Sequence, residues 1–509
     1  MNPTKVFNPE HDMALSNGDR HFIAPQNIRD MARDLAPLMS YVGSDGPLVW
    51  GWDHAICEQL LRMGIPADEL PSAEALASLR GHSGRQSAHE LLSMFHAQHA
   101  GGPYTGESII VTDTDQLPPF VARHHHVILK APYSSSGKGL RHVKEHQETH
   151  LNPPCEGGLE APRYQHPLPC REGWGGSISS WANALIRRHG YLTAEPYYDK
   201  VQDFAMEFIV TDDTCRFIGY SLFNTNAHGR YEANLLMEDE AIELLLAQHV
   251  PLAALHEVRE WIIAHAHHIV PAVWDTTRHP LYFGIDMMVV KDGRQCTIDN
   301  PRFRNQDPEF RIQNSQFKLH PCVEINLRLN MGIIAHEVRR QLVAPGSVGI
   351  FHVTTFASTE DALQFQECHA TRYPTCTDTE GLFVAGYHPL TPIYPHTRHH
   401  AYIVCRPQDA NQAEDKQHKP HSYPLTQGNP MKRRTLSLAA LALPLMLTAQ
   451  NPPLMGWSSW NTYGYQINDS VLKAQADDTV YTLQGQRISA PLHTLPQGVY
   501  IVGGKKVTK

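Results

Sequence analysis

The sequence lacks the features of proteins that bind nucleic acids or depend on disulfides. Its 509 residues include 43 lysines and arginines against 52 aspartates and glutamates, a formal net charge of −9. Binding to phosphate backbones needs an excess of positive surface, so a nucleic-acid partner is not expected. The nine cysteines are odd in number and form no CxxC pair. We therefore expect reduced thiols, a cytoplasmic main body and small-molecule partners.

The two commonest phosphate-binding loops are also missing from the segment that comes nearest to them, residues 127–143 (VILKAPYSSSGKGLRHV). A Walker A loop has glycine where Pro132 stands, and Ser or Thr where Gly139 stands. A dinucleotide-binding fingerprint has its third glycine where His142 stands. What remains is a strand, a Ser/Gly loop and a second strand. Its backbone amides could close over a polyphosphate beside Lys130, although a plain hairpin turn is the alternative.

The composition is that of a globular protein, with 41% hydrophobic and 19% charged residues. Short apolar runs alternate with helical periodicity, which indicates an α/β or α+β architecture. We divide the chain into a small α/β domain (1–115), a main domain (116–345), a C-terminal completion of that body (346–408), a polar linker (409–430) and a tail (431–509). Two long insertions are also predicted, at residues 152–177 and at residues 294–318.

A nucleoside site is predicted in residues 192–208 (LTAEPYYDKVQDFAMEF). An extended segment with Glu195, Tyr197 and Tyr198 could bind an adenine edge through backbone groups. A carboxylate, Asp203 or Glu207, could then accept hydrogen bonds from a ribose. An edge strand with surface acids would have the same pattern, so that alternative stays open.

Polar residues stand within two apolar strands further along. Asp286 lies in the middle of YFGIDMMVVKDG, and Glu324, Asn326 and Arg328 take alternate positions in HPCVEINLRLNMG. Side chains two residues apart in a strand share a face, so the last three are predicted to lie together. Burying them is costly unless they find partners, and oxygen-rich sites of this composition suit Mg²⁺. A structural salt-bridge network around Arg328 is the alternative.

Taken in order, these elements resemble the ATP-grasp superfamily, which includes D-alanine:D-alanine ligases and biotin carboxylases. The resemblance covers about residues 115–345 and implies an α/β (α+β) ATP-grasp fold, with the preceding α/β domain in front of it. Carried over residue by residue, it implies ATP phosphates on Lys130, a mobile phosphate lid of Ser134, Ser135, Ser136, Gly137, Lys138 and Gly139, adenine at Glu195, Tyr197 and Tyr198, ribose at Asp203, and two Mg²⁺ ions on Asp286, Glu324 and Asn326.

The resemblance also implies a reaction, the ATP-dependent ligation of a carboxylate. The acid would attack the γ-phosphate, an acyl phosphate would form, and an amine or similar nucleophile would displace phosphate. Lys130 and Arg328 are the implied catalytic residues, with Arg328 facing the transferred phosphate or the substrate carboxylate. Arg230 and Asn234 are candidate substrate contacts. A non-catalytic ATP-binding protein and a small-molecule kinase are the alternatives.

The tail of the chain has a different character. Residues 431–450 (MKRRTLSLAALALPLMLTAQ) are similar to a secretory signal peptide and too short for a stable membrane span. Residues 451–464 (NPPLMGWSSWNTYG) resemble the start of family 27 glycoside hydrolases, the α-galactosidase type, and the final residues resemble a type IX secretion tail. Such hydrolases need a barrel of about 250 residues, which is absent. We expect a chimeric or disordered C-terminus, with an anchored small domain as the rival interpretation.

Overall fold

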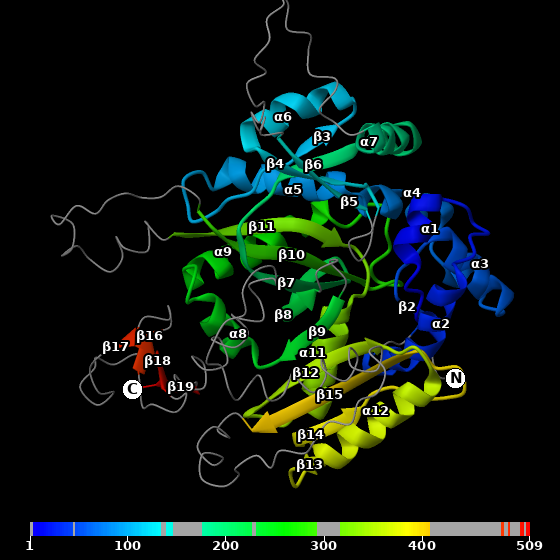
Figure 1. Cartoon of the computed structure of the whole chain (residues 1–509), viewed down its shortest axis with the longest axis vertical. Helices are drawn as coiled ribbons and strands as arrows, with labels where there is room; N and C mark the ends of the chain where they lie inside the picture. Colours follow the sequence, from blue (N-terminus) through cyan, green and yellow to red (C-terminus); the bar gives the residue numbers. More distant parts are fainter. Residues whose placement is uncertain are drawn as a thin grey trace, which may run out of the picture.

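The computed structural model describes residues 4–43, 46–133, 139–145, 176–225, 231–292 and 316–407, together with four short strands between residues 480 and 508. Helices and antiparallel sheets are interleaved along the chain, so the predicted α/β (α+β) class is confirmed (Figure 1). The predicted linker, signal-like segment and glycosidase-like start lie outside the described residues. The division into domains stays a prediction.

The N-terminal region surrounds a parallel pair of short strands with helices (Figure 1). The strands are β1 (Lys5–Val6) and β2 (Leu48–Val49). The helices are α1 (His11–Asn17), α2 (Gln26–Leu35), η1 (Ala36–Tyr41), α3 (His54–Arg62), η2 (Ala67–Glu69), α4 (Ala73–His82) and α5 (Arg85–Gln98). Asp53 caps α3 by accepting a hydrogen bond from the Ile56 N–H, which satisfies a backbone donor that the first helical turn leaves free. That cap fixes the position of the Asp53 carboxylate.

A small antiparallel sheet follows, in the order β3-β6-β4-β5. Its strands are β3 (Ile109–Val111), β4 (His126–Lys130), β5 (Leu140–Lys144) and β6 (Leu192–Pro196). One face packs on η3 (Thr114–Gln116), α6 (Leu117–His124) and α7 (Gly176–His189). The strands β4 and β5 are antiparallel neighbours, with Lys130 opposite Leu140, so the strand–loop–strand prediction is confirmed.

The large sheet has nine strands, all antiparallel to their neighbours, in the order β11-β10-β7-β8-β9-β12-β15-β14-β13. Its strands are β7 (Lys200–Thr211), β8 (Thr214–Thr225), β9 (Tyr231–Leu236), β10 (Leu281–Lys291), β11 (Phe317–Asn326), β12 (Ser347–Thr355), β13 (Cys376–Thr377), β14 (Phe383–Pro389) and β15 (His399–Pro407). The associated helices are α8 (Asp239–Leu246), α9 (Leu252–His265), η4 (Ala266–His268), α11 (Met331–Leu342) and α12 (Thr359–Arg372). Strands from the last part of the described body therefore continue the sheet that begins in the middle of the chain.

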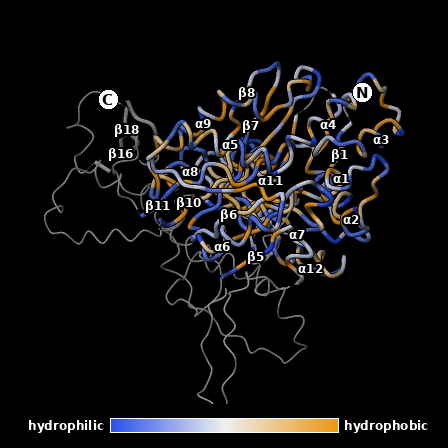
Figure 2. Tube along the Cα trace, turned by 90° about the horizontal axis from the view of Figure 1, so that it is seen from above, coloured by the Kyte–Doolittle hydropathy of each residue, from blue (hydrophilic) through white to orange (hydrophobic). Residues whose placement is uncertain are grey.

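The hydrophobic core joins the N-terminal region to the large sheet. One cluster runs from α3, α4 and α5 through β7 and β10 to α8 and α9, and a second links β1, β2 and η1 with α11, β12 and β15. Figure 2 shows the hydrophobic stretches gathered at the centre of the molecule. Because the N-terminal helices share this core, their polar ends are held against the sheets.

The remaining strands, β16 (Val480–Thr482), β17 (Arg487–Ile488), β18 (Val499–Val502) and β19 (Lys505–Thr508), form a separate four-stranded sheet. Among the described helices, none is both long enough and apolar enough to cross a membrane. Six cysteines in the described ranges have free thiols, namely Cys57, Cys215, Cys322, Cys368, Cys376 and Cys405.

A buried carboxyl group links the large sheet to α11. Glu207 lies opposite Gly284 in the β7–β10 pairing and is 1% exposed. The Asn330 side chain donates to it at 2.6 Å and also caps α11 by accepting from the Ile333 N–H at 3.0 Å. Burial raises the pKa of Glu207 from 4.5 to about 8. The folded protein therefore holds this carboxyl protonated at neutral pH.

The raised pKa predicts how stability depends on pH. The folded chain keeps the Glu207 proton between pH 4.5 and about 8, whereas the unfolded chain releases it, so stability falls as pH rises through this window. The Glu207→Gln variant cannot lose that proton and should show a shallower decline. Urea midpoints of both proteins at pH 5 and pH 8 measure the difference. Identical declines would contradict the assigned state of Glu207.

A second prediction concerns Gly332, in the first turn of α11. A Cβ at this position would lie 2.2 Å from the Glu207 carboxylate and 2.5 Å from the Ser221 hydroxyl. Gly332→Ala should therefore destabilise the protein. The matched control is Gly81→Ala, since a Cβ on this α4 glycine meets nothing within 4 Å and alanine favours helix by up to about 1 kcal/mol. Equal effects of the two substitutions on the urea midpoint would contradict the packing described.

Candidate functional site

A buried ion pair lies on the small sheet where the predicted phosphate loop begins. Leu129 belongs to the core beneath α6 and α7, so Lys130, the next residue, points to the opposite face. Its ammonium lies 2.5 Å from the Glu195 carboxylate of β6, and the two side chains are only 7% and 9% exposed. Each charge offsets the cost of burying the other. The pair supplies a fixed cation at the root of the loop.

The predicted carboxylates meet on the edge of the large sheet. Asp286 in β10 lies opposite Glu324 in β11, and the Asn326 side chain donates to Asp286 at 3.1 Å. Burial, followed by the proximity of Glu324 and Asp203, raises the pKa of Asp286 to about 7. Asp203 itself is paired with Lys200, yet burial still raises its pKa. These acids repel one another, which is the condition that a bound cation relieves.

The described residues contain no cluster of three or more His, Cys, Asp and Glu side chains arranged around a metal position. The available donors are the two carboxylates of Asp286 and Glu324 and the side-chain amide of Asn326. All of them offer oxygen, which suits Mg²⁺, an ion that usually keeps waters and substrate phosphates in its remaining positions. The donor set therefore fits Mg²⁺ together with a polyphosphate.

Arg85 is a site residue that the sequence analysis missed. It is the first residue of α5, is 8% exposed, and contacts Glu324 through its guanidinium at 3.0 Å. Its Nε donates to the carbonyl of Ala131 at 3.1 Å, and its backbone N–H donates to the carbonyl of Pro132. A cation at the N-terminus of a helix opposes the helix dipole. That unfavourable position was the only signal in the sequence, and by itself it does not distinguish Arg85 from a solvated arginine.

Arg328 follows β11 and joins the acids to α1. It donates to the Asn326 side chain at 3.1 Å, and to both carboxylate oxygens of Asp12 at 3.2 and 2.9 Å. Burial alone would raise the pKa of Asp12, but the Arg328 guanidinium lowers it overall. Two parallel bonds of this kind fix orientation as well as charge. The prediction that Glu324, Asn326 and Arg328 lie together is confirmed in space, although Arg328 lies beyond the end of the strand.

A small pocket brings these groups together. It is lined by His11 and Asp12 from α1, by Tyr133 from the loop after β4, and by Glu324 and Arg328 from the β11 end. Residues from three separate parts of the chain thus share one surface. A ligand here would touch both Glu324 and Arg328.

The predicted adenine segment follows β6. The Tyr197 ring stacks on His126 at 4.2 Å between centroids and is 52% exposed. Tyr198 turns inward, and its hydroxyl accepts a hydrogen bond from the Glu107 N–H at 2.8 Å. Burial raises the pKa of Tyr198. The adenine and ribose roles assigned to this segment stay predictions.

Several residues predicted for the site make no described contact with the charged groups above. Gly139 closes the hairpin, because its carbonyl accepts a hydrogen bond from the Ala131 N–H at 2.9 Å. Asn234 is 1% exposed and donates to the Ser221 hydroxyl at 2.5 Å within the large sheet, so its substrate role stays a prediction. Outside the described residues lie Ser134, Ser135, Ser136, Gly137, Lys138, Arg230 and most of both insertions.

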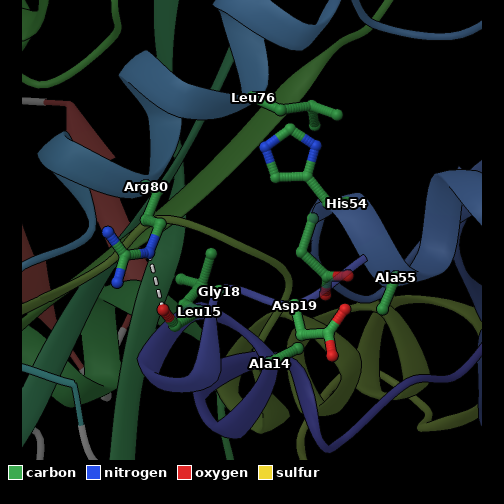
Figure 3. Close-up of a pocket in the computed structure, with 9 residues that line it drawn as sticks. Ala14, Leu15, Gly18, Asp19, His54, Ala55, Leu76 and Arg80 are labelled. Carbon is green, nitrogen blue, oxygen red and sulfur yellow. Dashed lines mark hydrogen bonds between the residues drawn. The ribbon is translucent and has the colours of Figure 1, made fainter. Parts of the chain in front are cut away.

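A second pocket lies beside α1 (Figure 3). It is lined by Ala14, Leu15 and Gly18 of the α1 segment and by His54 and Arg80 from neighbouring helices, and Arg80 donates to the Leu15 carbonyl at 2.7 Å. None of the predicted site residues lines it.

Comparisons with known proteins find no matching family model and no matching curated protein. Among solved structures, carboxyaminoimidazole ribonucleotide synthase from Aspergillus clavatus, complexed with ATP, is 12% identical, over 79% of this chain and 94% of that one, with a TM-score of 0.36. Biotin carboxylase from Campylobacter jejuni is 12% identical over 79% and 87%, with a TM-score of 0.38. L-amino acid ligase from Bacillus licheniformis is 11% identical over 74% and 80%, with a TM-score of 0.34.

Similarity at this level assigns none of the three activities to this chain. The strand order itself shows an α+β fold, with Lys130 on a small antiparallel sheet and paired carboxylates on the edge of a larger one.

Proposed function

We propose that the chain is an ATP-dependent carboxylate ligase of ATP-grasp type, which activates an acid as an acyl phosphate for attack by an amine or similar nucleophile. One observation carries the proposal. Two buried cations, Lys130 and Arg85, lie at the root of the Ser/Gly hairpin, and Arg85 also contacts Glu324, the neighbour of Asp286. A polyphosphate would match the positive charges of Lys130 and Arg85, and its divalent cation would match the carboxylates of Glu324 and Asp286.

In this proposal Lys130 and Arg85 bind the ATP phosphates, and the hairpin closed by Gly139 covers them with backbone amides. Glu195, Tyr197 and Tyr198 hold the adenine, and Asp203 holds the ribose. The orientation of β4 supports this arrangement, because Lys130 and Glu195 share the face of the small sheet away from α7.

Asp286, Glu324 and Asn326 would hold Mg²⁺. Burial, with repulsion from Glu324 and Asp203 added to it, raises the pKa of Asp286 to about 7, which supports this role because a nearby cation would stabilise the charged carboxylates. Bound Mg²⁺ supplies charge neutralisation at the phosphates. The chain itself contributes the fixed spacing of the carboxylates across β10 and β11.

The acid would enter the pocket between Asp12, Tyr133 and Arg328. An oxygen of its carboxylate forms a bond to the γ-phosphorus while the bond from that phosphorus to ADP breaks. Arg328 and Lys130 stabilise the charge on the transferred group, because both are held in place before the reaction begins. The nucleophile then attacks the acyl carbon, and phosphate leaves with the electron pair of the broken C–O bond.

Binding of Mg-ATP tests the site directly. At 100 times its dissociation constant, a ligand adds about 2.7 kcal/mol to the native state, so thermal unfolding of the full chain should shift upward with Mg-ATP. The shift should require Mg²⁺ and should be lost in Glu324→Gln. The control is Glu58→Gln, which removes a carboxylate from a surface pairing with Arg20 and leaves the site intact.

Stabilisation that is independent of Mg²⁺, or equal in Glu324→Gln and Glu58→Gln, would contradict the assigned cation site. If wild type binds Mg-ATP but releases ADP with none of a broad panel of carboxylic acids, a nucleotide-binding protein without ligase activity replaces the proposal. ADP release with alcohols instead would indicate a kinase.

The contact between Arg85 and Glu324 predicts a second result. The Arg85 guanidinium is buried and the Glu324 carboxylate is partly buried, so removing either one disturbs the charge balance around the other, and each of Arg85→Met and Glu324→Gln should destabilise the nucleotide-free protein. The double variant should be more stable, by about 0.5–3 kcal/mol, than the sum of the two single-variant changes in unfolding free energy predicts. Urea unfolding of the four proteins measures this coupling. Additive effects would show that the pair makes no energetic contribution.

A further inference from the structure

A buried histidine–aspartate pair lies on the wall of the pocket that contains Arg328. His11 is the first residue of α1, Asp53 caps α3, and the His11 Nδ1 lies 3.1 Å from a carboxylate oxygen of Asp53. The side chains are 1% and 4% exposed. The reaction described above assigns no role to either residue.

Asp53 is held from several sides. One of its oxygens accepts from the Ile56 N–H at 2.8 Å, and the other accepts from His11 Nδ1 and, at 3.5 Å, from the Asn8 side chain. A carboxylate can only accept, so the shared proton belongs on Nδ1, and in the neutral form of the ring the lone pair is then on Nε2. Asp53 therefore sets His11 in the tautomer that acts as a base.

The ring is also fixed in space. A Cβ at Gly51 would lie 2.4 Å from the His11 Cγ, so the strand end packs closely against one edge of the imidazole. The Nε2 atom is buried and has no hydrogen-bond partner among the described residues. A buried acceptor without a partner is unfavourable, and it is explained if a ligand supplies the missing donor.

Two contacts connect His11 to the reacting groups. His11 lines the same pocket as Glu324 and Arg328, and the next residue, Asp12, binds Arg328 through both carboxylate oxygens. The first turn of α1 is thus bound to the arginine proposed to stabilise the transferred phosphate. Asp12 is fully engaged by that arginine, which leaves His11 as the available base on this wall.

We propose that His11 is the general base of the ligase reaction, an inference that rests on the proposed function. As the attacking nitrogen forms its bond to the acyl carbon, His11 Nε2 takes one proton from that nitrogen. The C–O bond to the phosphoryl group breaks, and phosphate leaves with the electron pair. Asp53 is a positioning residue, since its carboxylate contacts the His11 ring but does not line the pocket that contains Arg328, and it stabilises the imidazolium that forms.

The test uses the full-length protein and compares two kinds of nucleophile as its substrates. Near neutral pH, hydroxylamine is largely unprotonated and attacks acyl phosphates without a catalytic base, whereas ordinary amines react slowly unless a base takes a proton from the nitrogen as the C–N bond forms. Mg-ATP and a panel of small carboxylic acids, amino acids included, are assayed for ADP release, once with hydroxylamine and once with a mixture of amino acids as amines. The variants are His11→Gln, Asp53→Asn and the control His54→Gln, a histidine that lines the other pocket.

The inference predicts that His11→Gln loses amine-dependent ADP release by 100-fold or more and keeps hydroxamate formation within a few-fold of wild type. Asp53→Asn should show the same split, and His54→Gln should match wild type. Equal loss with both nucleophiles would show that His11 only supports the structure, and equal retention would show that it has no role; either overturns the inference. Absence of hydroxamate with wild type would instead overturn the ligase proposal, and the role of His11 with it.

A measurement without turnover checks the same assignment. In nitrogen-15 spectra of histidine-labelled protein, the signals absent from His11→Gln identify His11. The inference predicts a proton on Nδ1 and none on Nε2 in the resting protein. A proton on Nε2 would overturn it, because that tautomer cannot accept a proton from the pocket.

Discussion

The structure depends on how like charges are balanced on two neighbouring strands at the edge of the large sheet, where the carboxylates are partly buried. Asp286 and Glu324 lie side by side on neighbouring strands, and burial makes their repulsion costly. The positive charges near them come from three separate segments: Lys130 ends a strand of the small sheet, Arg85 begins a helix of the N-terminal region, and Arg328 follows β11. Charge balance therefore holds together parts of the chain that share no local sequence.

This balance also explains why the N-terminal region belongs to the site. Its helices α3, α4 and α5 share the main hydrophobic core with the large sheet, and that core positions Arg85 at the start of α5. His11 and Asp12 of α1 line the same pocket as Arg328. Packing sets where these side chains lie, and the ion pairs set how their charged groups are oriented. A nucleotide with its cation would enter an arrangement in which the charges are already in place, which is the condition for electrostatic stabilisation of a transferred phosphate.

The sequence predicted the features that depend on local periodicity. Alternation along the strands placed Glu324 and Asn326 on one face, and the Ser/Gly loop after Lys130 marked a hairpin. It did not reveal Arg85, because a lone arginine before a helical stretch has no partner visible in sequence. Pairing between distant segments, such as Asp12 with Arg328, is set by the packed core, and the register of nine strands has no local signature.

The central claim is that a carboxylate is activated by phosphoryl transfer. It is tested most directly with an acid labelled by oxygen-18 in its carboxylate, chosen as the acid that releases most ADP with wild type. The account predicts that one labelled oxygen per turnover appears in the released phosphate, because the acyl–oxygen bond breaks when the nucleophile attacks. Phosphate released without label, while ADP forms and the acid is consumed, would contradict an acyl phosphate and with it the ligase mechanism.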